Sequence, residues 1–329
     1  MDQKRITGRI IESDFKPSLL LRNRHVQTIF PNIIYPGPRL HVLRERLELP
    51  DGDFIDVDWT ARKTGPIVIV LHGLEGSIKS HYAARMMRKL DELGFRGALP
   101  YFRGCSGEPN RLSIGYHSGF TQDLEFFSGV LKQREPQTPL AAVGYSLGGS
   151  VLLKWLGESV NSHRLVTAVA VSVPFDLADA SRTVEHGVSK IYKWNLLGSM
   201  RRSAHRKFKR VQPPFPLPNI RKLRSFRAFD NALTAPLHGF KDADDYYINC
   251  SSRFYLKNVT VPTLILHSMD DPLMTPASVP GEDELSPAVT LELSRKGGHV
   301  GFMNGSLLRP SMWLGDRISQ HLHQYLVNI

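Results

Sequence analysis

Cysteine is scarce in this chain of 329 residues, which contains only Cys105 and Cys250. Two cysteines are too few for a disulfide framework and fit a reducing compartment, so we expect two free thiols. The sequence also has no apolar run of the length that a signal peptide or a membrane-spanning helix requires. These absences lead us to expect a cytoplasmic protein.

Motifs that bind common cofactors are missing too. The sequence has no G-x-G-x-x-G after its first expected parallel strand, and no G-x-x-x-x-G-K-[ST], H-E-x-x-H or C-x-x-C. His321 and His323 lie two positions apart on an expected helix, so their rings face different sides. We place them on a solvated face and expect neither a cofactor nor a metal.

Positive charge is concentrated in one part of the chain. The formal net charge is +11, and residues 177–255 hold fifteen Lys and Arg against six Asp and Glu. Residues 186–227 contain no acid. This clustering favours a surface for anionic partners such as phospholipid head groups, although a merely solvated face has the same composition.

Aromatic and aliphatic residues are interspersed with these charges, at Tyr192, Trp194, Phe208, Phe215 and Phe226 and at Ile191, Leu196, Leu197 and Met200. The mixture suits an amphipathic cap better than a nucleic-acid surface, so we expect no nucleic-acid partner. Our hypothesis is a peripheral contact of residues 186–227 with an anionic membrane.

The apolar pattern predicts alternating strands and helices over most of the chain. Strands are expected at 43–49, 54–60, 66–71, 95–101, 140–143, 165–173, 263–267 and 289–293, and helices at 80–93, 121–134, 149–158 and 312–327. The first two strands flank Pro50-Asp51-Gly52 and should form an antiparallel hairpin. The later alternation indicates a mostly parallel sheet with helices on both faces. We expect one domain over 1–329, with a basic helical cap inserted at about 177–255.

A serine lies at a switch from strand to helix. The segment Gly144-Tyr145-Ser146-Leu147-Gly148 fits G-x-S-x-G and follows the expected strand at 140–143. In a nucleophile elbow the serine sits on a strained turn, and glycines are needed where a side chain would collide with the neighbouring strand or helix. We predict that Ser146 is a nucleophile supported by Gly144 and Gly148; the alternative is a glycine-rich turn without function.

A serine nucleophile needs a base and a group that orients the base. His299 follows the last expected strand within Gly297-Gly298-His299-Val300-Gly301 and is the predicted base. The acid should come between serine and histidine in the chain, where Asp270 and Asp271 follow the strand at 263–267. We favour Asp271 because Pro272 and an apolar residue follow it, with Asp270 capping or solvating the turn.

The anionic intermediate of acyl transfer requires two N–H donors. One should be the backbone of Leu147, directly after the nucleophile, and the other Leu74 in the loop His72-Gly73-Leu74-Glu75-Gly76-Ser77. We expect Gly73 to leave space for substrate and His72 to orient the loop.

These segments resemble the YheT-type esterases of bacteria, which are related to eukaryotic α/β-hydrolase-domain lipid hydrolases. The resemblance covers nearly the whole chain and is carried by the elbow, the loop at 72–77, Asn23-Arg24-His25-Val26-Gln27-Thr28, residues 102–110, Asp244-Asp245-Tyr246-Tyr247 and Gly298-His299-Val300-Gly301-Phe302. It implies an α/β-hydrolase fold, a relay of Ser146, Asp271 and His299, and hydrolysis of carboxylic esters such as acylglycerols or other acyl lipids.

Two other functions fit the same residues. An acyltransferase or thioesterase would form the same acyl-enzyme and differ in the acceptor or in the bond cleaved. A non-catalytic binding module would keep the fold without turnover, although the complete set of Ser146, Asp271 and His299 argues against it.

Overall fold

A nine-stranded sheet forms the centre of the computed structural model, which describes residues 7–34, 37–158, 164–306 and 310–327. Its strand order is β1 (Arg9–Glu12), β9 (Val289–Ser294), β8 (Thr263–Ser268), β7 (Thr167–Val171), β6 (Leu140–Tyr145), β4 (Ile67–Leu71), β5 (Arg96–Pro100), β3 (Phe54–Trp59) and β2 (Leu43–Glu48). In this order, neighbouring strands from β1 to β5 are parallel. The strand β3 runs antiparallel to β5, and β2 runs antiparallel to β3. The predicted mostly parallel sheet and opening hairpin are confirmed.

One strand was not expected from the sequence. The β1 segment pairs with β9 at the edge of the sheet, with Ile10 opposite Leu291. Its side chains are only half-buried or exposed, so it lacks the apolar pattern by which the other strands are recognised.

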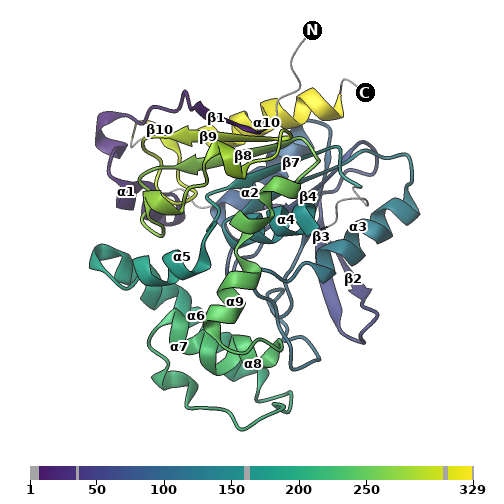
Figure 1. The fold of residues 1–329 in the computed structure, drawn as a ribbon. Helices are drawn as coiled ribbons and strands as arrows, with labels where there is room; N and C mark the ends of the chain where they lie inside the picture. The colour runs from purple at the N-terminus through teal and green to yellow at the C-terminus, as the bar shows by residue number, and fades with distance from the viewer. Residues whose placement is uncertain (1–6, 35–36, 159–163, 307–309, 328–329) are drawn as a thin grey trace.

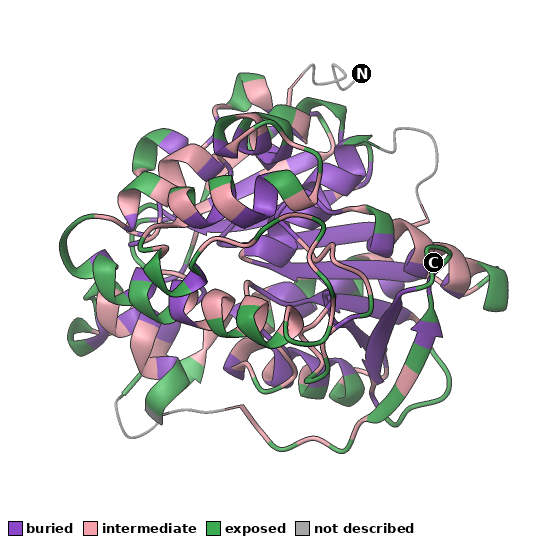
Figure 2. Ribbon diagram, turned by 90° about the horizontal axis from the view of Figure 1, so that it is seen from below, coloured by how far each residue is buried: buried purple, intermediate pink, exposed green. Residues whose placement is uncertain are grey.

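Helices cover both faces of the sheet (Figure 1). The helices α2 (His81–Glu92) and α10 (Trp313–Leu326) pack on one face, and α3 (Gln122–Arg134) and α4 (Leu147–Glu158) pack on the other. Alternate residues of β4 face these two layers: Val68 and Val70 join the α2 side, and Ile69 joins the α4 side. Burial on both faces explains the continuous apolar runs of the central strands, which Figure 2 shows as almost uniformly buried.

The chain leaves the sheet after β7 and returns to it at β8. Between them it forms α5 (Leu177–Thr183), α6 (Lys190–Lys207), α7 (Phe226–Phe229), a π-helical turn over Asp230–Thr234, α8 (Ala235–Leu237) and α9 (Ala243–Cys250). These elements lie together beyond the carboxyl ends of the parallel strands (Figure 1). They bury small cores of their own, one of which contains Leu197, Ile220, Phe229 and Leu233.

The remaining elements are short. They are α1 (Arg24–Ile34), the antiparallel pair β10 (Met303–Gly305) and β11 (Pro310–Met312), and 3-10 turns at Leu19–Leu21, Gly187–Ser189, Ile220–Lys222, Ser252–Asn258, Pro276–Ser278 and Glu282–Glu284. Both cysteines are free, as expected. Within the described ranges, every helix is too short or too polar to cross a membrane.

Candidate active site

Ser146 lies in a sharp turn between β6 and α4 with a positive φ of 52°. The flanking glycines leave no room for side chains: a Cβ on Gly148 would lie 2.5 Å from the carbonyl oxygens of Leu71 and His72, and one on Gly144 would lie 2.5 Å from the Gly148 oxygen. The sequence therefore folds locally into the strained elbow that its motif predicts.

Three side chains from separate loops meet at this elbow. The Ser146 Oγ lies 2.9 Å from His299 Nε2, and His299 Nδ1 lies 2.8 Å from Asp271 Oδ2. An ionised carboxylate can only accept hydrogen bonds, so Nδ1 carries the imidazole proton and Nε2 is left to accept from the serine hydroxyl. The Asp271 side chain is 1% exposed and the His299 side chain 12%.

The two adjacent aspartates have different partners. Asp271 Oδ1 accepts from the backbone N–H of Leu273 while Oδ2 faces His299. Asp270 Oδ1 instead accepts from the Ser268 hydroxyl and from the N–H of Gly298, just before the histidine. Of the two aspartates, only Asp271 contacts the imidazole, and Asp270 joins its own loop to the loop that carries His299.

The loop after β4 brings Leu74 beside the elbow. The backbone N–H groups of its two neighbours are already hydrogen-bonded: that of Gly73 donates to the Tyr82 hydroxyl at 2.9 Å, and that of Glu75 donates to the Tyr116 hydroxyl at 2.8 Å. In the part of the chain that the structure describes, the Leu74 N–H has no partner. Leu147 begins α4, so its N–H is one of those that a helix leaves unpaired. Among the described residues, these two N–H groups are therefore not engaged in hydrogen bonds with the protein.

His72 is buried beneath this loop. Its Nε2 accepts from the Phe102 N–H, so Nδ1 carries the proton and donates to the Gly73 carbonyl at 2.7 Å. Burial lowers the pKa of His72 to about 4, which keeps the ring neutral. His72 therefore holds the loop in place. A Cβ on Gly73 would lie 3.1 Å from the Tyr82 hydroxyl and 3.3 Å from the Cβ of Ser146, so a side chain there would crowd the serine.

The helix α1 supports the His299 loop, a role that sequence reasoning missed. The Thr28 hydroxyl accepts from the His299 N–H at 2.9 Å and donates to the Arg24 carbonyl. The Gln27 side chain bonds both backbone groups of Met303. These bonds join side chains of α1 to backbone groups far away in the sequence, and backbone groups leave no pattern in a sequence. The motif at 23–28 was therefore the only sign in the sequence that α1 has a role at the site.

Backbone strain is concentrated around the site. Positive φ occurs at five described non-glycine residues, namely Glu75, Ser146, Ser172, Val300 and Phe302. Ser172 follows β7 and its hydroxyl accepts from the N–H of Val300, next to the base. Such conformations cost on the order of 1 to 3 kcal/mol each and persist only where the surroundings enforce them.

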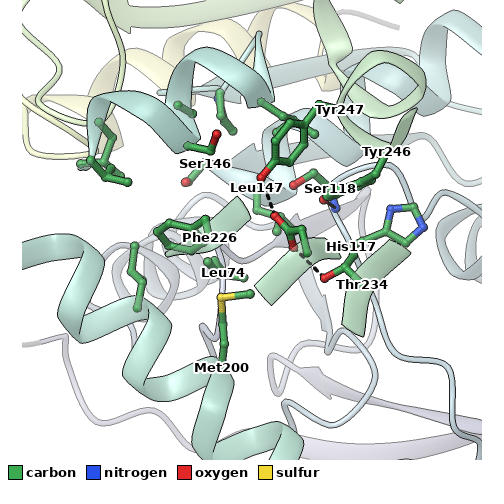
Figure 3. Close-up of a pocket in the computed structure, with 18 of the residues that line it drawn as sticks. Leu74, His117, Ser118, Ser146, Leu147, Met200, Phe226, Thr234, Tyr246 and Tyr247 are labelled. Atoms are coloured by element: carbon green, nitrogen blue, oxygen red, sulfur yellow. Dashed lines mark hydrogen bonds between the residues drawn. The ribbon is translucent and has the colours of Figure 1, made fainter. Parts of the chain in front are cut away.

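An apolar pocket opens from Ser146 beneath the helices that lie between β7 and β8, which we call the cap (Figure 3). Its empty volume is about 820 Å³. Apolar walls come from α5 and the residue that follows it, from α6 and from α7, through Leu177, Val184, Leu196, Met200 and Phe226. Tyr116, His117 and Ser118 also line it. Residues 102–110 contribute instead to a neighbouring cavity, through Arg103, Gly104, Pro109 and Asn110.

Another cavity that reaches Ser146 lies between α1 and α6. It has an empty volume of about 1410 Å³ and several polar lining residues, among them Asn32, Glu75, Ser80, Asn195 and Ser199. The elbow serine is therefore accessible from two cavities of different polarity.

No cluster of potential metal ligands occurs among the described residues. Of the two histidines on α10, His323 is exposed as expected, but the expectation of a solvated face is wrong for His321. Its Nε2 lies 2.8 Å from the Thr167 hydroxyl of β7, and burial lowers its pKa to about 4.

Comparisons with known proteins place the chain in a family. The sequence model of the "alpha/beta hydrolase fold" family matches residues 66–306. A protein of Escherichia coli (strain K12) named "Putative esterase YheT" is 40% identical over 320 residues, 95% of this chain and 94% of that protein. Human "Phospholipase ABHD3" is 28% identical over 97% of this chain and 80% of its own.

Two further proteins extend the comparison. "Monoacylglycerol lipase" of Saccharomyces cerevisiae is 30% identical over 72% of this chain and 55% of its own length. A solved structure of an esterase from Pyrococcus furiosus superposes with a TM-score of 0.57 over 98% of both chains at 14% identity, which shows a shared fold.

The chain therefore belongs to the α/β-hydrolase fold family, as its motifs predict. Its similarity to an esterase, a phospholipase and a lipase confirms the predicted enzyme class, an ester hydrolase.

The contact between Thr28 and His299 generates a prediction. Thr28→Val keeps the shape of the side chain but removes the acceptor that holds the base loop, so kcat should fall roughly ten- to a hundredfold, because small misplacements of reacting groups are costly. Thr28→Ser keeps the hydroxyl and should restore most of the rate. Steady-state kinetics on a 4-nitrophenyl ester would measure both. A serine variant as slow as the valine variant would contradict a role for the hydroxyl.

Proposed function

We propose that this enzyme cleaves carboxylic esters through an acyl-enzyme on Ser146, with His299 as general base and acid and Asp271 as the group that orients it. The observation that carries the proposal is the continuous hydrogen-bond chain of 2.9 and 2.8 Å through these side chains. A serine hydroxyl is a weak nucleophile near neutral pH, and this arrangement gives it a proton acceptor in place.

In the first half of the reaction, the Ser146 Oγ bonds to the ester carbonyl carbon while its proton moves to His299 Nε2. The carbonyl oxygen becomes an oxyanion, and the N–H groups of Leu147 and Leu74 stabilise it. Each such donor contributes roughly 3 to 4 kcal/mol in comparable sites. The bond to the alcohol then breaks, and the alcohol leaves with the proton from His299.

In the second half, water attacks the acyl-enzyme and gives a proton to His299. Collapse of the second oxyanion releases the carboxylic acid, and the proton returns to Ser146. Throughout, the imidazolium that forms twice per turnover is stabilised by the buried carboxylate of Asp271, 2.8 Å away.

The two cavities suit the two arms of an ester. We infer that the acyl chain enters the pocket beneath the cap, because side chains such as Leu196, Met200 and Phe226 form apolar walls there. The alcohol then lies in the more polar cavity between α1 and α6. Acyl esters of medium or longer chain, including acyl lipids, fit this division.

A chain-length series of 4-nitrophenyl esters tests the reaction. Wild-type enzyme should hydrolyse the series and take one fluorophosphonate label, because the proposed nucleophile is a single serine. Ser146→Ala should lower kcat by roughly a millionfold and abolish labelling. Intact mass measures the label, and thermal unfolding of the variant checks that it is folded. Turnover that survives in Ser146→Ala would refute the mechanism, and product analysis with an added alcohol distinguishes hydrolysis from acyl transfer.

We also propose that the cap contacts an anionic lipid surface. Ile33 of α1 and Ile191 of α6 line the mouth of the polar cavity with 68% and 57% of their surface exposed. Helical spacing places four residues on one face of α6, namely Ile191, Asn195, Ser199 and Arg202. The exposed Arg202 therefore lies on the same face of the helix as Ile191. Apolar side chains flanked by positive charge are typical of surfaces that rest in a lipid interface.

Flotation with lipid vesicles tests this contact. Wild-type protein should bind anionic vesicles in preference to neutral ones, and the double variant Arg202→Glu, Lys209→Glu should lose at least about tenfold in partitioning, since each basic residue near the surface contributes roughly 1 kcal/mol. The matched control Lys63→Glu, Lys257→Glu changes the net charge equally at exposed positions outside the cap helices and should bind nearly as well as wild type. Equal binding of wild type to both kinds of vesicle would remove the proposal.

A further inference from the structure

An acidic side chain lines the otherwise largely apolar pocket beneath the cap. Asp230 is only 6% exposed, and it shares the pocket with Ser146 and the apolar walls of α5, α6 and α7. No Lys or Arg is among the described residues that line this pocket. A buried carboxylate without a cationic partner is costly, and a functional role is one reason for a protein to keep it.

Two neighbours hold Asp230 in a fixed position. The Thr234 hydroxyl donates to Oδ1 at 2.7 Å, and the Tyr247 hydroxyl donates to Oδ2 at 2.8 Å; these are the two dashed bonds in Figure 3. A carboxylate has about four lone-pair sites, so these bonds leave acceptor capacity unused. Burial raises the pKa of Asp230 to about 6, so the group is a carboxylate at a pH well above that value.

The local backbone is also unusual. Residues Asp230–Thr234 form a π-helical turn between α7 and α8. Such turns are rare and frequently occur at functional sites. This turn brings Asp230 and Thr234 to the pocket wall together, where α9 supplies Tyr247 from the other side.

We propose that Asp230 is a specificity-determining residue that binds a hydrogen-bond donor, a hydroxyl or an ammonium group, on the acyl chain of the ester substrate. The inference rests on the proposed function, because it requires the acyl chain to occupy this pocket. A plain hydrocarbon chain would leave the remaining acceptor sites of Asp230 unpaired in an apolar cavity, which is unfavourable. A chain that carries a donor would pair with the carboxylate and displace water from it.

A purely structural role is the rival explanation. The bond between Asp230 and Tyr247 ties α9 to the π-helical turn, and loss of that bond would lower stability. A loss of stability, however, lowers the activity toward all substrates by the same factor. Loss of a binding contact changes the ratio of kcat/KM values between substrates that differ only at the donor. The ratio of kcat/KM values for matched esters therefore separates the two roles.

The experiment uses 4-nitrophenyl esters of equal chain length that end in a methyl, a hydroxyl or an ammonium group, made over a series of lengths and assayed well above the pKa of Asp230. At the length that reaches Asp230, wild type should prefer the hydroxyl or the ammonium ester over the methyl ester by at least about tenfold, as expected for a hydrogen bond to a charged group. A preference for ammonium over hydroxyl would identify a cationic substrate, and the reverse a hydroxylated one.

Variants assign the preference to this residue. Asp230→Leu should abolish the preference for both polar esters. Asp230→Asn keeps one acceptor oxygen for one of the two hydroxyls of Thr234 and Tyr247, and its NH2 group can donate to the other hydroxyl. It should therefore fold if the leucine variant does not, and it should reduce the preference for ammonium by at least about tenfold while retaining more of that for hydroxyl. Asp244→Asn is the matched control, since this exposed acid of α9 pairs with Arg227 away from the pocket lining.

Two failures are distinguishable. If wild type hydrolyses the methyl esters at least as well as the polar ones at every length, or if the Asp230 variants keep the wild-type ratios, the specificity proposal is overturned while the esterase mechanism stands. If no ester is hydrolysed and Ser146 takes no label, the proposed function itself fails.

Discussion

The hydrogen-bond chain from Asp271 through His299 to Ser146 is the constraint on which the rest of the site depends. Its members follow three different strands, β8, β9 and β6, whose carboxyl ends meet at one edge of the sheet. A hydrogen bond weakens when the distance between donor and acceptor grows by a few tenths of an ångström. The three loops must therefore be held in register, that is, in fixed positions relative to one another. The rigid parallel sheet supplies that register, and the cap adds the pocket. The Ser189 hydroxyl of the cap also donates to the Pro272 carbonyl, next to Asp271.

The register is maintained by strained backbone and by contacts that enforce the strain. Ser146 and Val300 adopt positive φ beside the reacting groups. Thr28 from α1 and Ser172 from the end of β7 each accept an N–H of the base loop, and Asp270 joins that loop to the acid loop. The site is therefore built from the sheet edge and α1 together, which explains why a helix from the beginning of the chain lies beside His299.

Much of this could be predicted from the sequence because the signals are local. The elbow at Ser146 combines a glycine motif with a strand and a helix on either side, and His299 and Asp271 each follow a recognisable strand. The support from Thr28 could not be derived in the same way, since its partner lies 271 positions away and is a backbone group that any residue possesses. The strand β1 was missed because its four residues, Arg9–Glu12, form neither the continuous apolar run of a central strand nor an alternating pattern.

The position of Asp230 could not be predicted for a similar reason. Its place on the pocket wall depends on a π-helical turn and on how the cap packs against the sheet, and one sequence fixes neither. The same holds for the two cavities, whose different polarity arises from side chains of α1, α5, α6 and α7 that come together only in the folded protein.

The most direct test of the relay compares its two adjacent aspartates. Asp271→Asn removes the charge that orients and stabilises the imidazole, so kcat should fall roughly ten-thousandfold in steady-state ester hydrolysis. Asp270→Asn keeps an acceptor for the Gly298 N–H and does not touch the imidazole, so its kcat should remain within about tenfold of wild type. Equal losses in the two variants, or a larger loss for Asp270→Asn, would contradict the assignment of Asp271 as the orienting acid.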